Sequence, residues 1–169
     1  MAISAMLSHG VLVITAGVLL YVALTDLKQF KIRNEMIIVL VGLFIIHACL
    51  SGRWVGPHWN LALATFMFAV TLFFYSLGWL GGGDVKILAV GFLWVGVACA
   101  LIFAVLLSIF AMLHLAATKI GWAKVQQMGD RNRIPFAPSV AAALIVCFML
   151  GCLEPTSLPM GLPSIELAQ

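Results

Sequence analysis

Long apolar runs alternate with short polar segments along the whole chain. By length and hydropathy they predict helices at 3–25, 36–50, 61–80 and 136–153, with a longer run at 85–118. A helix needs about 20 residues to cross a bilayer, so this length allows one small bundle and leaves no room for a separate soluble domain. The pattern predicts an all-α fold, a polytopic helix bundle in which residues 1–169 form a single transmembrane domain.

The run at 85–118 is too long for one straight span. As a single helix it would be about 50 Å long, against a hydrocarbon core of about 30 Å, so we expect it to fold back on itself. Gly91 and Gly96 are the candidate break points. We favour Gly96, because it leaves a short helix from Asp84 and a full helix ending near Thr118. Six transmembrane helices result.

The basic residues predict the orientation, because cytoplasmic loops of membrane proteins are enriched in Lys and Arg. With six spans and the N-terminus outside, Arg53 alone lies on the external side. The remaining basic residues are then cytoplasmic: Lys28, Lys31, Arg33, Lys86, Lys119, Lys124, Arg131 and Arg133. A five-span arrangement would divide the same residues almost evenly between the two sides, so the asymmetry favours six.

The composition agrees with a membrane protein. The chain is 64% hydrophobic and 9% charged, whereas a soluble domain carries about 25% charged residues. No basic residue precedes Lys28, so we expect the first apolar run to remain as a helix and not to be removed as a signal peptide. The three prolines of residues 155–169 predict an irregular external tail.

The cysteines and histidines do not form a known metal pattern. There is no C-x-x-C pair and no H-E-x-x-H, and the four histidines are scattered over different segments. We expect no metal and no cofactor. We also expect no disulfide, with the cysteines buried as small hydrophobic residues: Cys49, Cys99, Cys147 and Cys152. His114 could approach the cytoplasmic helix ends, but we favour an interfacial histidine with its hydrogen bonds satisfied.

Two aspartates stand at helix ends on the predicted cytoplasmic side. Asp26 follows the first apolar run and Asp84 precedes the long one, each two positions before a lysine, Lys28 or Lys86. Carboxylates at such positions are costly to bury and mark ion paths, proton relays or catalysis. A single one would be a helix-end charge paired with its lysine, but the parallel D-x-K settings favour a functional pair.

Two close carboxyl groups can hydrolyse a peptide bond without metal. One acts as base on water, while the other, protonated, polarises the carbonyl. Asp84 lies at a helix N-terminus and Asp26 at a helix C-terminus, so the dipoles favour Asp84 as the ionised member. Glycine before Asp84, at Gly81 and Gly83, leaves room for an extended substrate backbone.

Three motifs resemble those of the prepilin peptidase family. Gly81-Gly82-Gly83-Asp84 matches the G-x-G-D signature of membrane aspartic proteases, and residues 85–89 continue it in the prepilin peptidase manner. Asp26-Leu27-Lys28 followed by Ile32-Arg33-Asn34 is similar to the family's D-x-x-x-x-x-I-P-N, with Arg33 in place of proline. Ile134-Pro135-Phe136-Ala137-Pro138 resembles I-P-F-x-P. Presenilin-like proteases share G-x-G-D, but their P-A-L motif is absent from this sequence.

The resemblance implies an aspartic endopeptidase that removes a basic leader from pilin precursors at the cytoplasmic face of a bacterial inner membrane. Asp26 and Asp84 would be catalytic, with Gly81, Gly83, Lys86, Lys28 and Asn34 in support. The lysines would adjust the pKa of the pair or set topology, and Asn34 would cap the second helix. The sequence has no paired-cysteine region, so it resembles the short, peptidase-only members of tight-adherence (Flp) systems. N-methylation stays open.

Two other readings of the aspartate pair stay open. The residues could serve a proton relay in a small transporter, or a structural role in a pilus-assembly membrane subunit. The implied partners are a prepilin and the lipid bilayer, and no nucleic acid is expected. The oligomeric state is left open.

Overall fold

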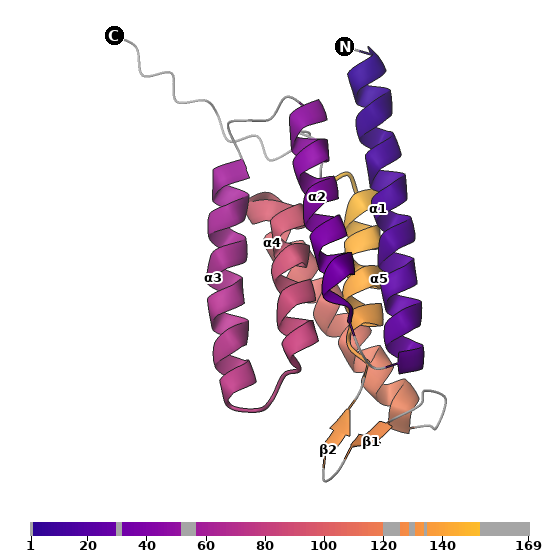
Figure 1. Ribbon diagram of the computed structural model, residues 1–169, viewed down its shortest axis with the longest axis vertical. Coiled ribbons are helices and arrows are strands. Elements are labelled where there is room, and N and C mark those ends of the chain that lie inside the picture. The colour runs from indigo at the N-terminus through magenta and orange to yellow at the C-terminus, as the bar shows by residue number, and fades with distance from the viewer. Residues whose placement is uncertain are drawn as a thin grey trace.

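A computed structural model of the chain describes residues 2–29, 32–51, 57–119, 126–128, 131–133 and 135–152. Within these ranges the chain forms a helical bundle with one small hairpin (Figure 1). The elements in chain order are α1 (Ala2–Gln29), α2 (Asn34–Leu50), α3 (Pro57–Ser76), α4 (Gly82–Lys119), β1 (Gln126–Met128), β2 (Arg131–Arg133) and α5 (Ala137–Met149).

Element α4 consists of two helices joined at Gly96. The backbone of Gly96 has φ 66° and ψ −175°, which is outside the helical region and open mainly to glycine. Figure 1 shows the chain running away from α3's lower loop along the first part of α4 and returning along the second. The ring of Phe103, after the break, packs edge to face on Phe92, before it, with centroids 5.1 Å apart. The predicted break at Gly96 is therefore confirmed.

Gly91, the other predicted break point, has a packing role instead. A Cβ at this position would lie 2.8 Å from Cζ of Phe103. Its missing side chain therefore lets the two halves of α4 approach closely.

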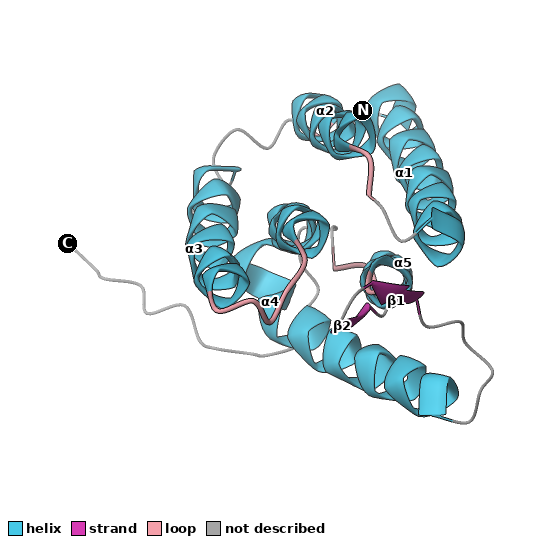
Figure 2. Cartoon of the chain, turned by 60° about the horizontal axis from the view of Figure 1, so that its bottom comes forward, coloured by secondary structure: helices cyan, strands magenta, loops and turns pink. Residues whose placement is uncertain are grey.

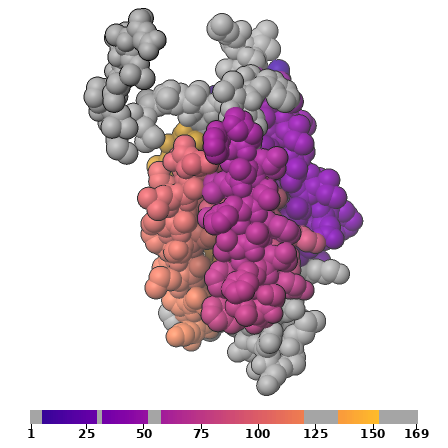
Figure 3. Space-filling model, turned by 90° about the vertical axis from the view of Figure 1, so that its left-hand side faces the viewer, coloured from indigo at the N-terminus to yellow at the C-terminus, as the bar shows by residue number. Residues whose placement is uncertain are grey.

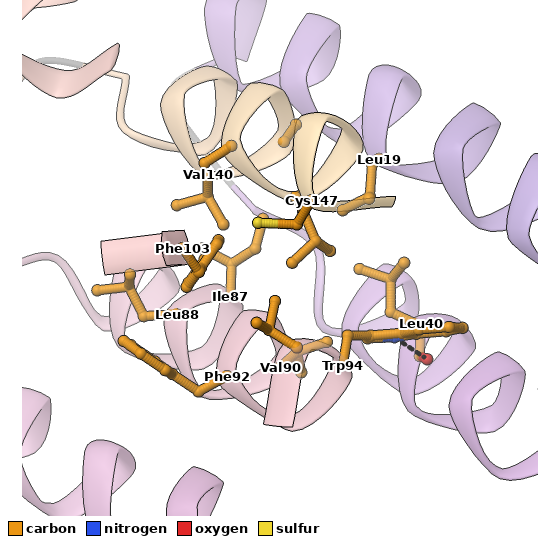
Figure 4. Packing of buried hydrophobic residues seen from close by; sticks show 14 of the residues in the cluster. Leu19, Leu40, Ile87, Leu88, Val90, Phe92, Trp94, Phe103, Val140 and Cys147 are labelled. Carbon is orange, nitrogen blue, oxygen red and sulfur yellow. Dashed lines mark hydrogen bonds between the residues drawn. The ribbon is translucent and has the colours of Figure 1, made fainter. Parts of the chain in front are cut away.

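The first half of α4 is the centre of the bundle. Nearly every residue from Val85 to Gly96 is buried, and Figure 2 shows this helix enclosed by the other elements. A helix that is apolar all round belongs in a protein core or in a membrane, and here neighbouring helices cover it. The indole N–H of Trp94 donates to the carbonyl oxygen of Leu40 in α2 at 3.1 Å, which satisfies its one polar atom inside the core (Figure 4).

The outer helices are apolar on their exposed sides. Among the residues that the structure describes, three helices are long and apolar enough to cross a membrane, by length and composition: Met6–Gln29, His58–Ser76 and Gly82–Lys119. Figure 3 shows α3 beside the second half of α4 on one face. Large apolar side chains are exposed along both, among them Trp59, Phe66, Leu101 and Met112. Such a surface is typical of a protein surrounded by lipid.

The hairpin of β1 and β2 departs from the all-α prediction. The two strands pair antiparallel, with Gln127 opposite Asn132, between α4 and α5 (Figure 1). Five of the six strand residues are polar, Met128 being the exception, and no apolar pattern marked them as strands. The helical class is otherwise confirmed.

Two predictions about the cysteines are wrong, namely the absence of a disulfide and the burial of Cys49. Cys99 and Cys152 form a disulfide, with Cα atoms 5.9 Å apart, although they are 53 positions apart in the sequence. The reversal at Gly96 and the length of α5 bring both cysteines to one end of the bundle. The absence of a C-x-x-C pair does not exclude a disulfide between cysteines that are distant in the sequence. Cys147 is free and buried, as predicted, whereas Cys49 is free and exposed. The predicted tail, 155–169, lies outside the described residues.

Candidate active site

Asp26 lies on the last turns of α1 and is buried, with 4% of its surface exposed. One carboxylate oxygen, Oδ2, accepts a hydrogen bond from the backbone N–H of Ala137 at 3.0 Å. The backbone of Phe136 also interacts with the same carboxyl group. Asp26 is thus held at the N-terminus of α5.

The sequence explains why α5 offers these donors. The first N–H groups of a helix have no partner inside it, and proline lacks an N–H altogether. Prolines flank the entry at Pro135 and Pro138, so Phe136 and Ala137 carry the free donors between them. The I-P-F-x-P motif at residues 134–138 therefore supplies the N–H group of Ala137 that fixes the Asp26 carboxyl group. Ile134, the first residue of the motif, lies outside the described residues.

Asp84 lies in the first turn of α4 and is half-buried. Its Oδ2 accepts a hydrogen bond from the backbone N–H of Gly81 at 3.1 Å. Asp84 is the third residue of α4, and Gly81 directly precedes the helix. The bond therefore matches one of the two hydrogen bonds of a capping box. The bond fixes Asp84 to its own helix end.

The glycines of the loop are required by close contacts. A Cβ on Gly81 would lie 2.8 Å from Oδ2 of Asp84, so any side chain there displaces the carboxylate. A Cβ on Gly83 would lie 3.2 Å from Cβ of Ile32. Gly82 differs, because its nearest neighbour, the ring of Tyr75, would be at an ordinary 3.6 Å.

A second contact, besides that of Ile32 with Gly83, joins the start of α2 to the start of α4. The Lys86 ammonium donates to Oδ1 of Asn34 at 2.8 Å, across 52 positions of sequence. The predicted helix cap at Asn34 is wrong, because α2 begins at Asn34 itself and Arg33 holds the cap position without a side-chain bond. Asn34 instead ties the start of α2 to the start of α4.

The remaining charged residues at this end are exposed wherever the structure describes their side chains. Lys28 lies on the last turn of α1, with its side chain exposed. Arg33 pairs with Glu35 at 2.6 Å on the surface, where an ion pair contributes little to stability.

His114, on the second half of α4, lies at the same end of the bundle as Asp26. It interacts electrostatically with Asp26. Its Nε2 is buried and has no hydrogen-bond partner among the described residues, contrary to the expectation of a satisfied interfacial histidine. Only the reversal of α4 brings it to this end, and no sequence motif marked it.

Each aspartate accepts a hydrogen bond from a backbone N–H group at the start of a helix. Ala137 donates to Asp26 at the start of α5, and Gly81 donates to Asp84 at the start of α4. The predicted proton assignment used only the dipole of α1 at Asp26, whereas the N-terminus of α5 acts on Asp26 in the opposite sense. Which aspartate carries the proton stays a prediction. Within the described ranges, no three His, Cys, Asp or Glu side chains gather as a metal site.

Comparisons with known proteins agree with the three motifs. Residues 13–117 match the type IV leader peptidase family. The chain is 32% identical over 149 residues to a prepilin leader peptidase/N-methyltransferase of Bacillus subtilis (strain 168), an alignment that covers 82% of this chain and 55% of that protein. The chain thus spans about half the length of this curated relative. No solved structure matches this chain significantly. This protein belongs to the type IV leader peptidase family.

Proposed function

We propose that this protein is a membrane aspartic endopeptidase that removes the leader of prepilin-like precursors, with Asp26 and Asp84 as its catalytic pair. The observation that carries the proposal is the meeting of three motifs at one end of the bundle. Asp26 binds Ala137 of the third motif. Ile32 of the first motif packs against Gly83, next to Asp84 of the second.

In the proposed reaction, water attacks the carbonyl carbon of the scissile peptide bond. The ionised aspartate, assigned as Asp84, takes the proton of that water, while the protonated Asp26 donates its proton to the carbonyl oxygen. Breakdown of the tetrahedral intermediate returns a proton to the leaving amine. The backbone N–H bonds from Gly81 and Ala137 hold both carboxyl groups, so little reorganisation is needed during the reaction.

The same proposal includes six transmembrane spans with the N-terminus outside. Its support is the reversal at Gly96, which makes two spans from α4, and the side on which basic residues gather. Lys28, Lys86 and Lys119 lie at the helix ends near the aspartates (Figure 1). The positive-inside rule assigns that end to the cytoplasm. The bacterial source of the relative supports a bacterial inner (cytoplasmic) membrane as the location.

This position suits a substrate that is itself a membrane segment. A prepilin leader would end where its apolar helix leaves the bilayer, at the depth of the proposed site. Glycine at Gly81 and Gly83 keeps Asp84 and Ile32 close to the start of α4, because a Cβ at either position would press on them. The relative's name also includes N-methyltransferase, but the proposal here is restricted to the peptidase reaction.

The test is cleavage of a co-expressed prepilin in cells, followed by its mobility shift on a gel. Wild type should cut the precursor, whereas Asp26→Asn and Asp84→Asn at equal expression should not. Asn keeps the side-chain oxygen that accepts the backbone bond, so each variant removes the acid and preserves the fold. Glu35→Gln is a matched control, because it neutralises an exposed acid at the same end and should leave cleavage intact.

The alternatives make different predictions for the same variants. A structural subunit would tolerate either Asn substitution with its function intact. A proton relay would lose transport and show no precursor cleavage even in the wild type. Normal cleavage by either Asp variant would refute the catalytic pair.

A further inference from the structure

The end of the bundle opposite the aspartates carries a covalent link. Cys99 lies three residues beyond the reversal at Gly96, and Cys152 lies just beyond the end of α5. Helix α5 starts at Ala137, beside Asp26, and its 13 residues span about 20 Å. The disulfide and the candidate active site are therefore at opposite ends of α5.

Cys152 is held by a defined helix termination. The N–H of Cys152 donates to the carbonyl of Cys147 at 3.1 Å, and the N–H of Gly151 donates to Phe148 at 3.2 Å. Together with φ 72° at Gly151, these bonds form a Schellman motif, which fixes the two residues after the helix. One cysteine of the pair is thus positioned by local backbone structure.

Cys99 is positioned by the reversal of α4. The side-chain amide of Asn60, on α3, lies where a Cβ of Gly96 would stand, so α3 packs directly on the turn. Cys99 is buried one turn beyond it. The Cα atoms of Cys99 and Cys152 are 5.9 Å apart, within the usual range for a disulfide.

We propose that Cys99 and Cys152 are oxidised on the external face of the membrane, by a protein of the thiol–disulfide oxidoreductase class, after the bundle has inserted. The two thiols lose two protons and two electrons as the S–S bond forms, and the disulfide of the oxidant is reduced to a dithiol. The proposal rests on the proposed orientation, because such oxidants act outside the cytoplasm. The link then holds the turn of α4 against α5, the helix that presents Ala137 to Asp26.

Thiol counting tests the bond without using peptidase activity. Membranes are quenched in acid, denatured in detergent and reacted with a maleimide-linked polymer, which adds a visible mass per free thiol. The chain has four cysteines, of which Cys49 and Cys147 are free. Wild type should therefore gain two adducts without reductant and four with it. Four adducts without reductant would show that the bond is absent and overturn the proposal.

Two variants serve as controls. Cys99→Ser should show three adducts with or without reductant, because Cys152 is left unpaired. Cys49→Ser should show one adduct without reductant and three with it, since its cysteine is outside the pair. Equal adduct numbers with and without reductant in Cys49→Ser would contradict the assigned pairing.

The compartment is tested in anaerobic cells that lack their extracytoplasmic disulfide-forming pathway. We expect four adducts without reductant in these cells, and two in otherwise identical cells that keep the pathway. Two adducts in both strains would refute the assigned oxidant. Prepilin cleavage is measured in parallel. Cleavage by Cys99→Ser, with the bond lost, separates this inference from the proposed peptidase function.

Discussion

The carboxylate of Asp26 accepts a hydrogen bond from the backbone N–H of Ala137, 111 residues further along the chain. The bond joins the end of α1 to the start of α5 and places one proposed catalytic group at a fixed point. It also makes Asp26 a structural residue in addition to its proposed catalytic role. The two roles are separable by choice of substitution.

Asp26→Ala and Asp26→Asn should differ in stability although both abolish the acid. Alanine leaves the buried N–H of Ala137 without its acceptor, which costs about 1–3 kcal/mol, whereas asparagine retains an acceptor oxygen. Thermal unfolding in detergent should therefore place Asp26→Ala below Asp26→Asn, with Asp26→Asn close to wild type. Equal unfolding temperatures for the two variants would mean that this hydrogen bond contributes nothing to the fold.

The three glycines before Asp84 should respond unequally to alanine. Gly81→Ala places a methyl group against Oδ2 of Asp84, and a misplaced catalytic group costs roughly 100-fold in rate. Gly83→Ala presses on Ile32 and should lose about tenfold. Gly82→Ala is the matched control, because its methyl group would make only an ordinary contact with the ring of Tyr75. Cleavage rates in detergent measure the series, and a Gly82→Ala loss as large as that of Gly81→Ala would contradict the steric account.

Lys86 and Asn34 should be coupled. Their hydrogen bond is exposed, so the coupling free energy should be about 0.5–1 kcal/mol. A double-mutant cycle of Lys86→Met and Asn34→Ala on unfolding free energy measures it. If the two single effects simply add, the contact seen between α2 and α4 does not stabilise the protein.

Gly96 should be the most sensitive glycine of the bundle. Alanine there must adopt φ near 66° and overlaps Asn60, so we expect a loss of at least about 2 kcal/mol. Gly10→Ala on α1 is the control, since a Cβ there would meet nothing within 4 Å and helix propensity favours alanine by up to about 1 kcal/mol. Unfolding of both variants in detergent tests this, and a Gly96→Ala protein as stable as Gly10→Ala would contradict the break.

The sequence was sufficient for features with local causes. The break at Gly96 was predictable because the run exceeds the bilayer thickness and glycine alone tolerates the required φ. Contacts that depend on helix arrangement were not. The partner of Asp26, the approach of His114 and the pairing of Cys99 with Cys152 all need the reversed α4 and the placement of α5, which no local pattern encodes. Asn34 was assigned to a helix cap on residue preference alone. Such a preference cannot reveal the hydrogen bond from Lys86, 52 positions away in the sequence.

The most direct test of the catalytic pair is the cleavage rate of a synthetic prepilin peptide by purified wild type, Asp26→Asn, Asp84→Asn and the double variant. Residues that act as a unit are non-additive, so we predict that each single variant loses at least about 1,000-fold and that the double variant loses little more. If either single variant keeps more than about a tenth of the wild-type rate, a deficit of only about 1.4 kcal/mol, then Asp26 and Asp84 are not the catalytic pair.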